Sequence, residues 1–223
     1  MNKKWIAIIT LSLCVVLSVI SYFYWDLPLT IYCKGLGRSV LDIAEFITIW
    51  GESRWYYIIL VPAFLYFRFL AKNKLWSMRI IFIFISISAS GLINMLVKWL
   101  AGRHRPINFF DKGLFGFDHF HTIYELMSFP SGHTVTVFSL AVAVSILFPR
   151  TSIAAFITAI SIGMTRIIIT SHYLSDVIAG TAGIGILSTM IVKYIFDRKK
   201  IELDKKQKGC ATKLWVGQFF SPL

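Results

Sequence analysis

Two histidines stand in surroundings that suit phosphoryl transfer. His172 precedes Asp176 by four residues, so the two side chains share a face if a helix begins early enough to include both. A carboxylate bonded to one imidazole nitrogen fixes the tautomer and leaves the other nitrogen as a nucleophile. His133 follows a Pro-Ser-Gly turn and opens a long apolar run. From that position it could give a proton to a departing oxygen.

Cations that could hold a phosphate accompany these histidines. Lys98, Arg105 and Arg166 supply charge suited to a group with two or three ionised oxygens. The Pro-Ser-Gly turn feeds a helix, and the first backbone N–H groups of a helix form an anion site. We expect the N–H groups of Gly132 and His133 to complete this site. Charged side chains at the ends of apolar segments are rare without a functional reason.

The acidic residues of the same region do not suggest a metal site. Asp111, Asp118 and Glu125 are scattered through one loop rather than clustered, which disfavours a two-metal phosphatase. The three cysteines show neither a CxxC motif nor a Cys/His ligand spacing. We therefore expect no metal, no cofactor and no disulfide framework.

The elements that must position these groups are membrane helices. The chain has 223 residues, is 57% hydrophobic and 15% charged, and has a mean hydropathy of +0.70, whereas soluble domains are about a quarter charged. Six apolar runs approach the roughly 20 residues that cross a bilayer. They are Trp5–Tyr24, Trp55–Phe69, Met78–Leu100, His133–Phe148, Ser152–Thr170 and Asp176–Phe196. The sequence predicts an all-α polytopic membrane protein with six transmembrane helices.

The distribution of basic residues predicts the orientation of these helices. With the N-terminus inside, most of the 23 lysines and arginines lie on the cytoplasmic side, as the positive-inside rule requires. Both termini are then cytoplasmic, and Lys98, His133 and His172 meet at the outer membrane boundary. This pattern explains most of the net charge of +12 without nucleic acid as a partner. The lipid bilayer is the expected partner, and no obligate protein partner is evident.

The chain divides into one membrane domain and a tail. Residues 1–200 form the six-helix domain, and residues 201–223 form a basic tail that we expect to be loosely ordered. The first segment is interpreted as an uncleaved helix rather than a signal peptide, because its apolar run is long and lacks a small-residue cleavage site.

Three motifs in order resemble the tripartite signature of the type 2 phosphatidic acid phosphatase family. They are Lys98, six residues and Arg105-Pro106; then Pro130-Ser131-Gly132-His133; then Arg166, five residues, His172, three residues and Asp176. Each motif alone is a weak signal, but three in order with matching internal spacing are specific. The resemblance spans roughly residues 92–182. The family usually has serine before the arginine of the last motif, where this chain keeps a hydroxyl with Thr165.

The resemblance implies a metal-independent hydrolase that works through a phosphohistidine. His172 would attack phosphorus while Asp176 orients it, and His133 would protonate the departing alkoxide and then activate water. The phosphoryl oxygens would be held by Lys98, Arg105, Ser131, Gly132 and Arg166. The remaining motif residues, in supporting positions, are Pro106, Pro130 and Thr165.

The expected substrate is a phosphate on a bacterial envelope lipid. Candidates are lipid A phosphate, phosphatidylglycerol phosphate, undecaprenyl pyrophosphate and phosphatidic acid, and the aromatic loop Asn108–His121 favours a bulky lipid such as lipid A phosphate. A lipid phosphotransferase would need the same residues. An anion transporter or channel is disfavoured because it needs no His–Asp pair. The expected location is the cytoplasmic membrane, with the site facing the periplasm or exterior.

Overall fold

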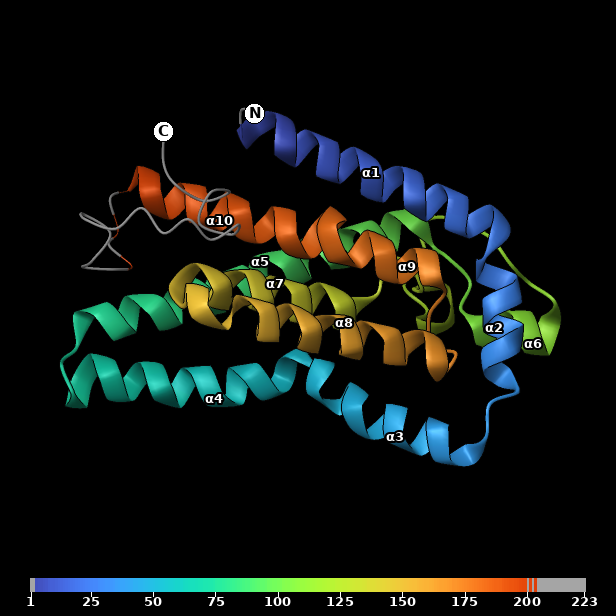
Figure 1. Ribbon diagram of the computed structural model, residues 1–223, viewed down its shortest axis with the longest axis horizontal. Coiled ribbons are helices and arrows are strands. Elements are labelled where there is room, and N and C mark those ends of the chain that lie inside the picture. Colours follow the sequence, from blue (N-terminus) through green and yellow to red (C-terminus); the bar gives the residue numbers. More distant parts are fainter. Residues whose placement is uncertain (1–2, 200, 202, 204–223) are drawn as a thin grey trace.

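The computed structural model describes residues 3–199, 201 and 203, and its elements are helices with one isolated β-bridge between Arg103 and Phe117. The α-helices (Figure 1) are α1 (Lys3–Tyr24), α2 (Asp26–Lys34), α3 (Arg38–Thr48), α4 (Ser53–Leu65), α5 (Lys74–Ala101), α6 (Pro106–Lys112), α7 (Gly132–Leu147), α8 (Ser152–Ile168), α9 (Leu174–Ile178) and α10 (Leu187–Arg198). Shorter segments are η1 (Ile49–Gly51), η2 (Tyr66–Leu70), η3 (Tyr124–Leu126), η4 (Pro149–Thr151) and η5 (Ala179–Ile186), of which η2 and η5 are π-helical. The predicted all-α class is confirmed.

The helix α7 lies at the centre of the bundle. Its apolar residues surround the helix instead of forming one stripe, which is typical of a helix that is covered on every side. It packs against α5, α8 and η5, and most of its side chains are buried. Figure 1 shows α5, α7 and α8 running side by side, with α4 below them and α1 and α10 above. The functional residues at the start of α7 are therefore attached to the most enclosed helix.

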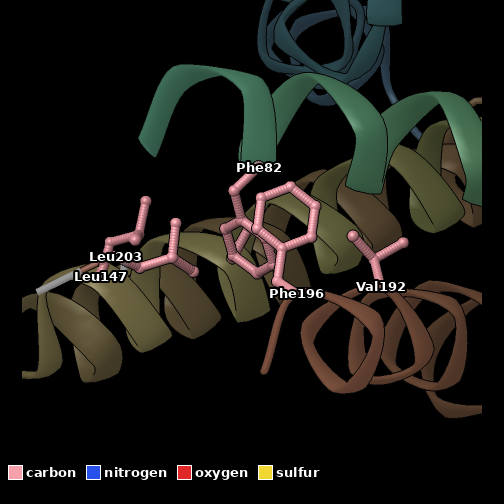
Figure 2. Close-up of a cluster of buried hydrophobic side chains, with 6 residues drawn as sticks. Phe82, Leu147, Val192, Phe196 and Leu203 are labelled. Carbon is pink, nitrogen blue, oxygen red and sulfur yellow. The ribbon is translucent and has the colours of Figure 1, made fainter. Parts of the chain in front are cut away.

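A cluster of large apolar side chains holds one end of the bundle together. Figure 2 shows Phe82 of α5 meeting Val192 and Phe196 of α10, beside Leu147 of α7 and Leu203. The rings of Phe82 and Phe196 pack edge to face, with their centroids 5.3 Å apart, an arrangement that aromatic pairs favour. This cluster involves the start of α5 and the ends of α7 and α10. The opposite end, where α5 ends and α7 begins, is called the site end below.

Three helices among the described residues are long and apolar enough to cross a membrane. They are Lys74–Ala101, Pro149–Ile168 and Leu174–Arg198. A fourth crossing is added if Leu11–Tyr24 and Asp26–Lys34, which are inclined at 62°, form one broken span. The central helix α7 is apolar but shorter. Each of the six segments expected from the sequence is largely helical, whereas six membrane crossings remain a prediction.

The loop between α5 and α7 folds back over the site end. Gly102 ends α5 in the left-handed region, with φ of 59°, and its N–H donates to the carbonyl of Lys98. A Cβ at Gly102 would lie 1.5 Å from the carbonyl oxygen of Asp118, so no other residue fits this crossing. The backbone of Arg103 next accepts a hydrogen bond from the N–H of Ser128 at 3.0 Å. The returning chain thus brings residues 102–105 against the segment that leads into α7.

The predicted boundary after residue 200 remains a prediction, because the tail of residues 204–223 lies outside the described residues. Of the tail, Leu203 packs into the cluster of Figure 2, and Ile201 lies against the same cluster.

Candidate active site

His172 lies in the connection between α8 and α9 and is 2% exposed. The backbone N–H groups of Ser171 and His172 both donate to the carbonyl of Arg166, at 3.0 and 3.1 Å, which fixes the connection to the end of α8. Its Nδ1 lies 3.5 Å from Oδ2 of Asp176, and its Nε2 lies 3.5 Å from a guanidinium nitrogen of Arg105. One ring nitrogen therefore faces the carboxylate and the other faces the cation.

The surroundings keep the imidazole of His172 neutral. Burial lowers the pKa of His172 well below its ordinary value; the hydrogen bond with Asp176 opposes this shift, and the charge of Arg105 adds to it. A neutral ring whose Nδ1–H donates a hydrogen bond to the carboxylate keeps a lone pair on Nε2. This is the form of histidine that acts as a nucleophile.

Asp176 is fully buried and accepts several hydrogen bonds. Its Oδ2 accepts from the hydroxyl of Ser128 at 2.6 Å and from the backbone N–H of Tyr173 at 3.0 Å. Its Oδ1 accepts from Arg103. A carboxylate with this many donors has one orientation and stays ionised. It therefore fixes the position of the imidazole that it faces.

Two predicted cations are held by backbone carbonyls of the loop. Lys98 Nζ donates to the carbonyl of Met127 at 2.6 Å, and Arg105 donates to the same carbonyl at 3.3 Å. Arg105 also donates to the carbonyls of Tyr124 and Ser171, at 2.9 and 3.1 Å. Carbonyls orient a cation without cancelling its charge. Both side chains are thus oriented by uncharged backbone groups.

His133 and Arg166 approach from α7 and α8. Arg166 donates to the hydroxyl of Thr48 at 2.9 Å, and its buried Nε has no hydrogen-bond partner among the described residues. The ring of His133 lies close enough to Arg166, Arg105 and Lys98 for their charges, after its burial, to oppose its protonation. The ring is only partly buried. A group bound among these cations would therefore lie beside an accessible imidazole.

The first turn of α7 lies between Asp176 and Lys98. The backbone N–H of Ser131 donates to the carbonyl of Asp176 at 3.0 Å, and the hydroxyl of Ser131 accepts from that of Thr134 at 3.0 Å. The hydroxyl proton of Ser131 remains available to an anion. A Cβ at Gly132 would lie 4.0 Å from Cε of Lys98, so this helix start faces the lysine. Free N–H groups of a first turn attract anions.

The supporting motif residues have local roles. Pro106 is buried in the first turn of α6, directly after Arg105. The peptide bond before Pro130 is cis. The hydroxyl of Thr165 donates to the carbonyl of Ile162 at 2.6 Å, within its own helix.

The structure brings together three cations, two histidines and one carboxylate at the site end. The combination suits capture of a phosphate, attack by one imidazole and proton transfer by the other. Within the residues that the structure describes, no three His, Cys, Asp or Glu side chains gather closely enough to hold a metal ion.

Four further residues belong to this arrangement, and none of them is among the predicted site residues. Ser128 and Arg103 bond to Asp176, Thr48 bonds to Arg166, and Asp26 bonds to Arg103. Arg103 and Asp26 had one visible signal, a charge beside an apolar segment. Thr48 had none, because a threonine near the end of an amphipathic segment is unremarkable.

Comparison with known proteins relates this arrangement to one family. The family model of the PAP2 superfamily matches residues 76–201, which contain all three motifs. The lipid A 1-phosphatase of Rhizobium johnstonii is 33% identical over 209 residues, which are 87% of this chain and 82% of the relative. The lipid A 1-phosphatase of Rhizobium etli is 37% identical over 158 residues, which are 65% of this chain and 66% of the relative.

A solved structure shares the fold. The transmembrane PAP2-type phosphatidylglycerolphosphate phosphatase of Bacillus subtilis superposes with a TM-score of 0.65 at 19% identity, covering 88% of this chain and 97% of that chain. At this identity the likeness concerns the fold alone, and it agrees with the apolar helices in indicating a membrane protein.

Proposed function

The chain belongs to the PAP2 superfamily, and on this basis we propose that it is a membrane lipid phosphatase that releases phosphate through a covalent intermediate on His172. The observation that carries the proposal is the setting of His172, with Nδ1 facing Asp176 and Nε2 facing Arg105. A buried neutral imidazole between a carboxylate and a cation suits attack on a phosphoryl group.

In the first half-reaction, Nε2 of His172 attacks phosphorus and the bond from phosphorus to the lipid oxygen breaks. His133 gives its proton to that oxygen, so the lipid leaves as a neutral alcohol. Charge develops on the equatorial phosphoryl oxygens, where it is stabilised by groups already in place. These groups are the side chains of Lys98, Arg105, Ser131 and Arg166 and the backbone at Gly132.

In the second half-reaction, His133 takes a proton from water and the oxygen of that water attacks phosphorus. The bond between phosphorus and Nε2 of His172 breaks, and inorganic phosphate leaves. Asp176 keeps the ring oriented in both steps. Because none of these steps uses a metal ligand, we propose that catalysis is metal-independent.

We propose a phosphate on lipid A as the substrate, ahead of phosphatidylglycerol phosphate, undecaprenyl pyrophosphate and phosphatidic acid. Support comes from the two rhizobial relatives, both lipid A 1-phosphatases. Lipid A belongs to the envelope of Gram-negative bacteria, so the proposed location is the cytoplasmic membrane with the site end facing the periplasm.

Phosphate release by purified full-length protein in detergent tests this function. The substrates are lipid A carrying the 1-phosphate alone, lipid A carrying the 4′-phosphate alone, phosphatidylglycerol phosphate and undecaprenyl pyrophosphate, with His172→Ala as the inactive control. The proposal predicts fastest release from the 1-phosphate. Faster release from phosphatidylglycerol phosphate would show that a glycerophospholipid, and not lipid A, is the preferred substrate. Transfer of the phosphoryl group to a lipid acceptor without free phosphate would indicate a phosphotransferase. No release from any lipid would reject the function.

A further inference from the structure

A chain of three buried charged side chains ends at Asp176. Arg103 donates through NH1 to Oδ1 of Asp176 and through NH2 to Oδ2 of Asp26, the latter at 2.6 Å. All three side chains have no exposure to solvent. The guanidinium therefore joins the first residue of α2 to the first turn of α9. Asp26 and Arg103 lie 77 residues apart in the sequence.

Further contacts hold this chain in one geometry. The hydroxyl of Ser175 accepts from Arg103 at 2.7 Å and donates to Asp26. The other oxygen of Asp26 accepts from the backbone N–H of Ser175 and from the hydroxyl of Ser21, both at 2.9 Å. Nearly every acceptor and donor is thus occupied, as a buried ionic group requires if it is to keep one arrangement.

Aromatic rings separate Arg103 from solvent. Its guanidinium carbon lies 4.5 to 5.5 Å from the centroids of four rings: Tyr173, Tyr22, Phe117 and Phe115. Two of these rings, Phe115 and Phe117, come from the aromatic loop that the sequence linked to lipid contact. Phe117 is itself partly exposed to solvent, as is Phe120 of the same loop. The cage keeps water from the ion pairs and so strengthens them.

The geometry of the Asp176 carboxylate shows how Arg103 and Asp26 could contribute to catalysis. Arg103 occupies Oδ1 of Asp176, which leaves Oδ2 for His172 and Ser128. One cation between two carboxylates leaves a net negative charge on the group. An isolated Arg103–Asp176 pair would be neutral and would offer less stabilisation to a ring that becomes positive on phosphorylation.

We propose that Asp26 and Arg103 are positioning residues for the reaction, which orient the Asp176 carboxylate and preserve its negative charge toward His172. The inference rests on the proposed function, since it assumes that His172 carries the phosphoryl group. Arg103 fixes which oxygen of Asp176 faces the imidazole. Asp26 also pairs with the guanidinium of Arg103, so that Arg103 does not neutralise Asp176 completely.

A double-mutant cycle tests this role. Asp26→Asn should lower kcat about 10- to 100-fold, by analogy with residues that orient metal ligands, with little change in KM. Arg103→Lys should do the same, because a lysine keeps the charge but cannot bridge two carboxylates and a hydroxyl. Asp26→Glu, which restores the charge, should recover part of the loss. Thr30→Val is the matched control, because it changes a buried residue of the same helix α2 outside the hydrogen bonds described above, and should leave kcat near the parental value.

The decisive arm repeats Asp26→Asn in an Asp176→Asn background. If Asp26 acts through Asp176, the second substitution should cause almost no further loss of kcat, since the group on which it acts has been neutralised. Independent, multiplicative losses would overturn the proposal and assign Asp26 to the fold alone. Should Asp26→Asn fail to fold, Ser175→Ala, which removes the bridging hydroxyl, takes its place in the same cycle with the same two outcomes.

The activity of the parental protein in the same assay distinguishes failure of the positioning role from failure of the proposed phosphatase function. If it releases lipid phosphate and the cycle is multiplicative, only the positioning role is rejected. If the parent releases no phosphate from any lipid, the proposed function fails and this inference is rejected with it.

Discussion

Gly51 packs directly against the ring of His133. A Cβ at position 51 would lie 2.7 Å from Cδ2 of the imidazole and 3.1 Å from its Cβ. The segment η1, which ends at Gly51, therefore forms one wall of the proposed proton-transfer site. It follows α3, whose Thr48 bonds to Arg166. The connection from α3 to α4 thus contacts two of the groups expected to surround the phosphate.

Gly51→Ala should lower kcat by up to about 100-fold, because a displaced catalytic group loses alignment with the reacting oxygen. The methyl group would push His133 or Ile162 aside. Gly37→Ala is the matched control, since nothing lies within 4 Å of a Cβ at that position. Steady-state phosphate release by both purified variants measures the effect. Equal activity of the two variants would mean that Ile162 and not His133 moves to make room for the methyl group, and the expected loss of kcat would be wrong.

His172 should stay neutral as the pH falls through about 6.5, the ordinary pKa of histidine. Burial lowers its pKa well below that value, and Arg105 adds to the shift against the opposing Asp176. The unfolded chain takes up a proton below about pH 6.5 and the folded chain does not, so this residue contributes stability above that pH and loses it below. Nitrogen-15 spectra of histidine-labelled protein, assigned with His172→Gln, report the titration. A midpoint at or above pH 6.5 would contradict the burial argument.

Chelation should leave activity intact. The proposed steps use histidines and cationic side chains, and the described residues contain no cluster of three metal-binding side chains. Phosphate release after EDTA treatment and passage over a chelating resin provides the measurement. Loss of activity that a divalent ion restores would require a metal in the mechanism.

Much of the site was predictable because its motifs are local. The turn before His133 is one such local motif. His172 lies outside α9, which begins at Leu174, so its contact with Asp176 depends on the connection that is bonded to Arg166 and not on a shared helical face. The apolar runs likewise predict the helices, since length and hydropathy suffice. Lys98 and Arg105 were predicted in the same way, from the spacing of the first motif.

The contacts that join distant segments were not predictable from spacing. Asp26 reaches Arg103 only because α1 and α2 meet at an angle of 62°, and the sequence carried no signal for this bend beyond the residues YWDLP. The π-helical turn η5 was also invisible, because small residues such as those of AGTAGIGI fit an ordinary helix equally well. Such contacts depend on packing between elements rather than on local pattern.

Reporter fusions test the predicted orientation of the helices. A reporter at the C-terminus should lie in the cytoplasm, and a reporter after Asp118 should lie on the opposite side, because the basic residues concentrate on the side of both termini. The fusion pair needs a folded, active parent as its control. If both fusions report the same compartment, the six-helix topology is wrong.

The identity of the phosphorylated residue tests the central claim most directly. His133→Ala should be incubated with p-nitrophenyl phosphate, whose leaving group needs no protonation, quenched in alkali to preserve phosphohistidine, and digested for mass spectrometry. The slow second half-reaction should leave a phosphoryl group on His172, and His133→Ala/His172→Ala should carry none. A phosphoryl group on another residue, or phosphate release by His172→Ala at the parental rate, would contradict the mechanism.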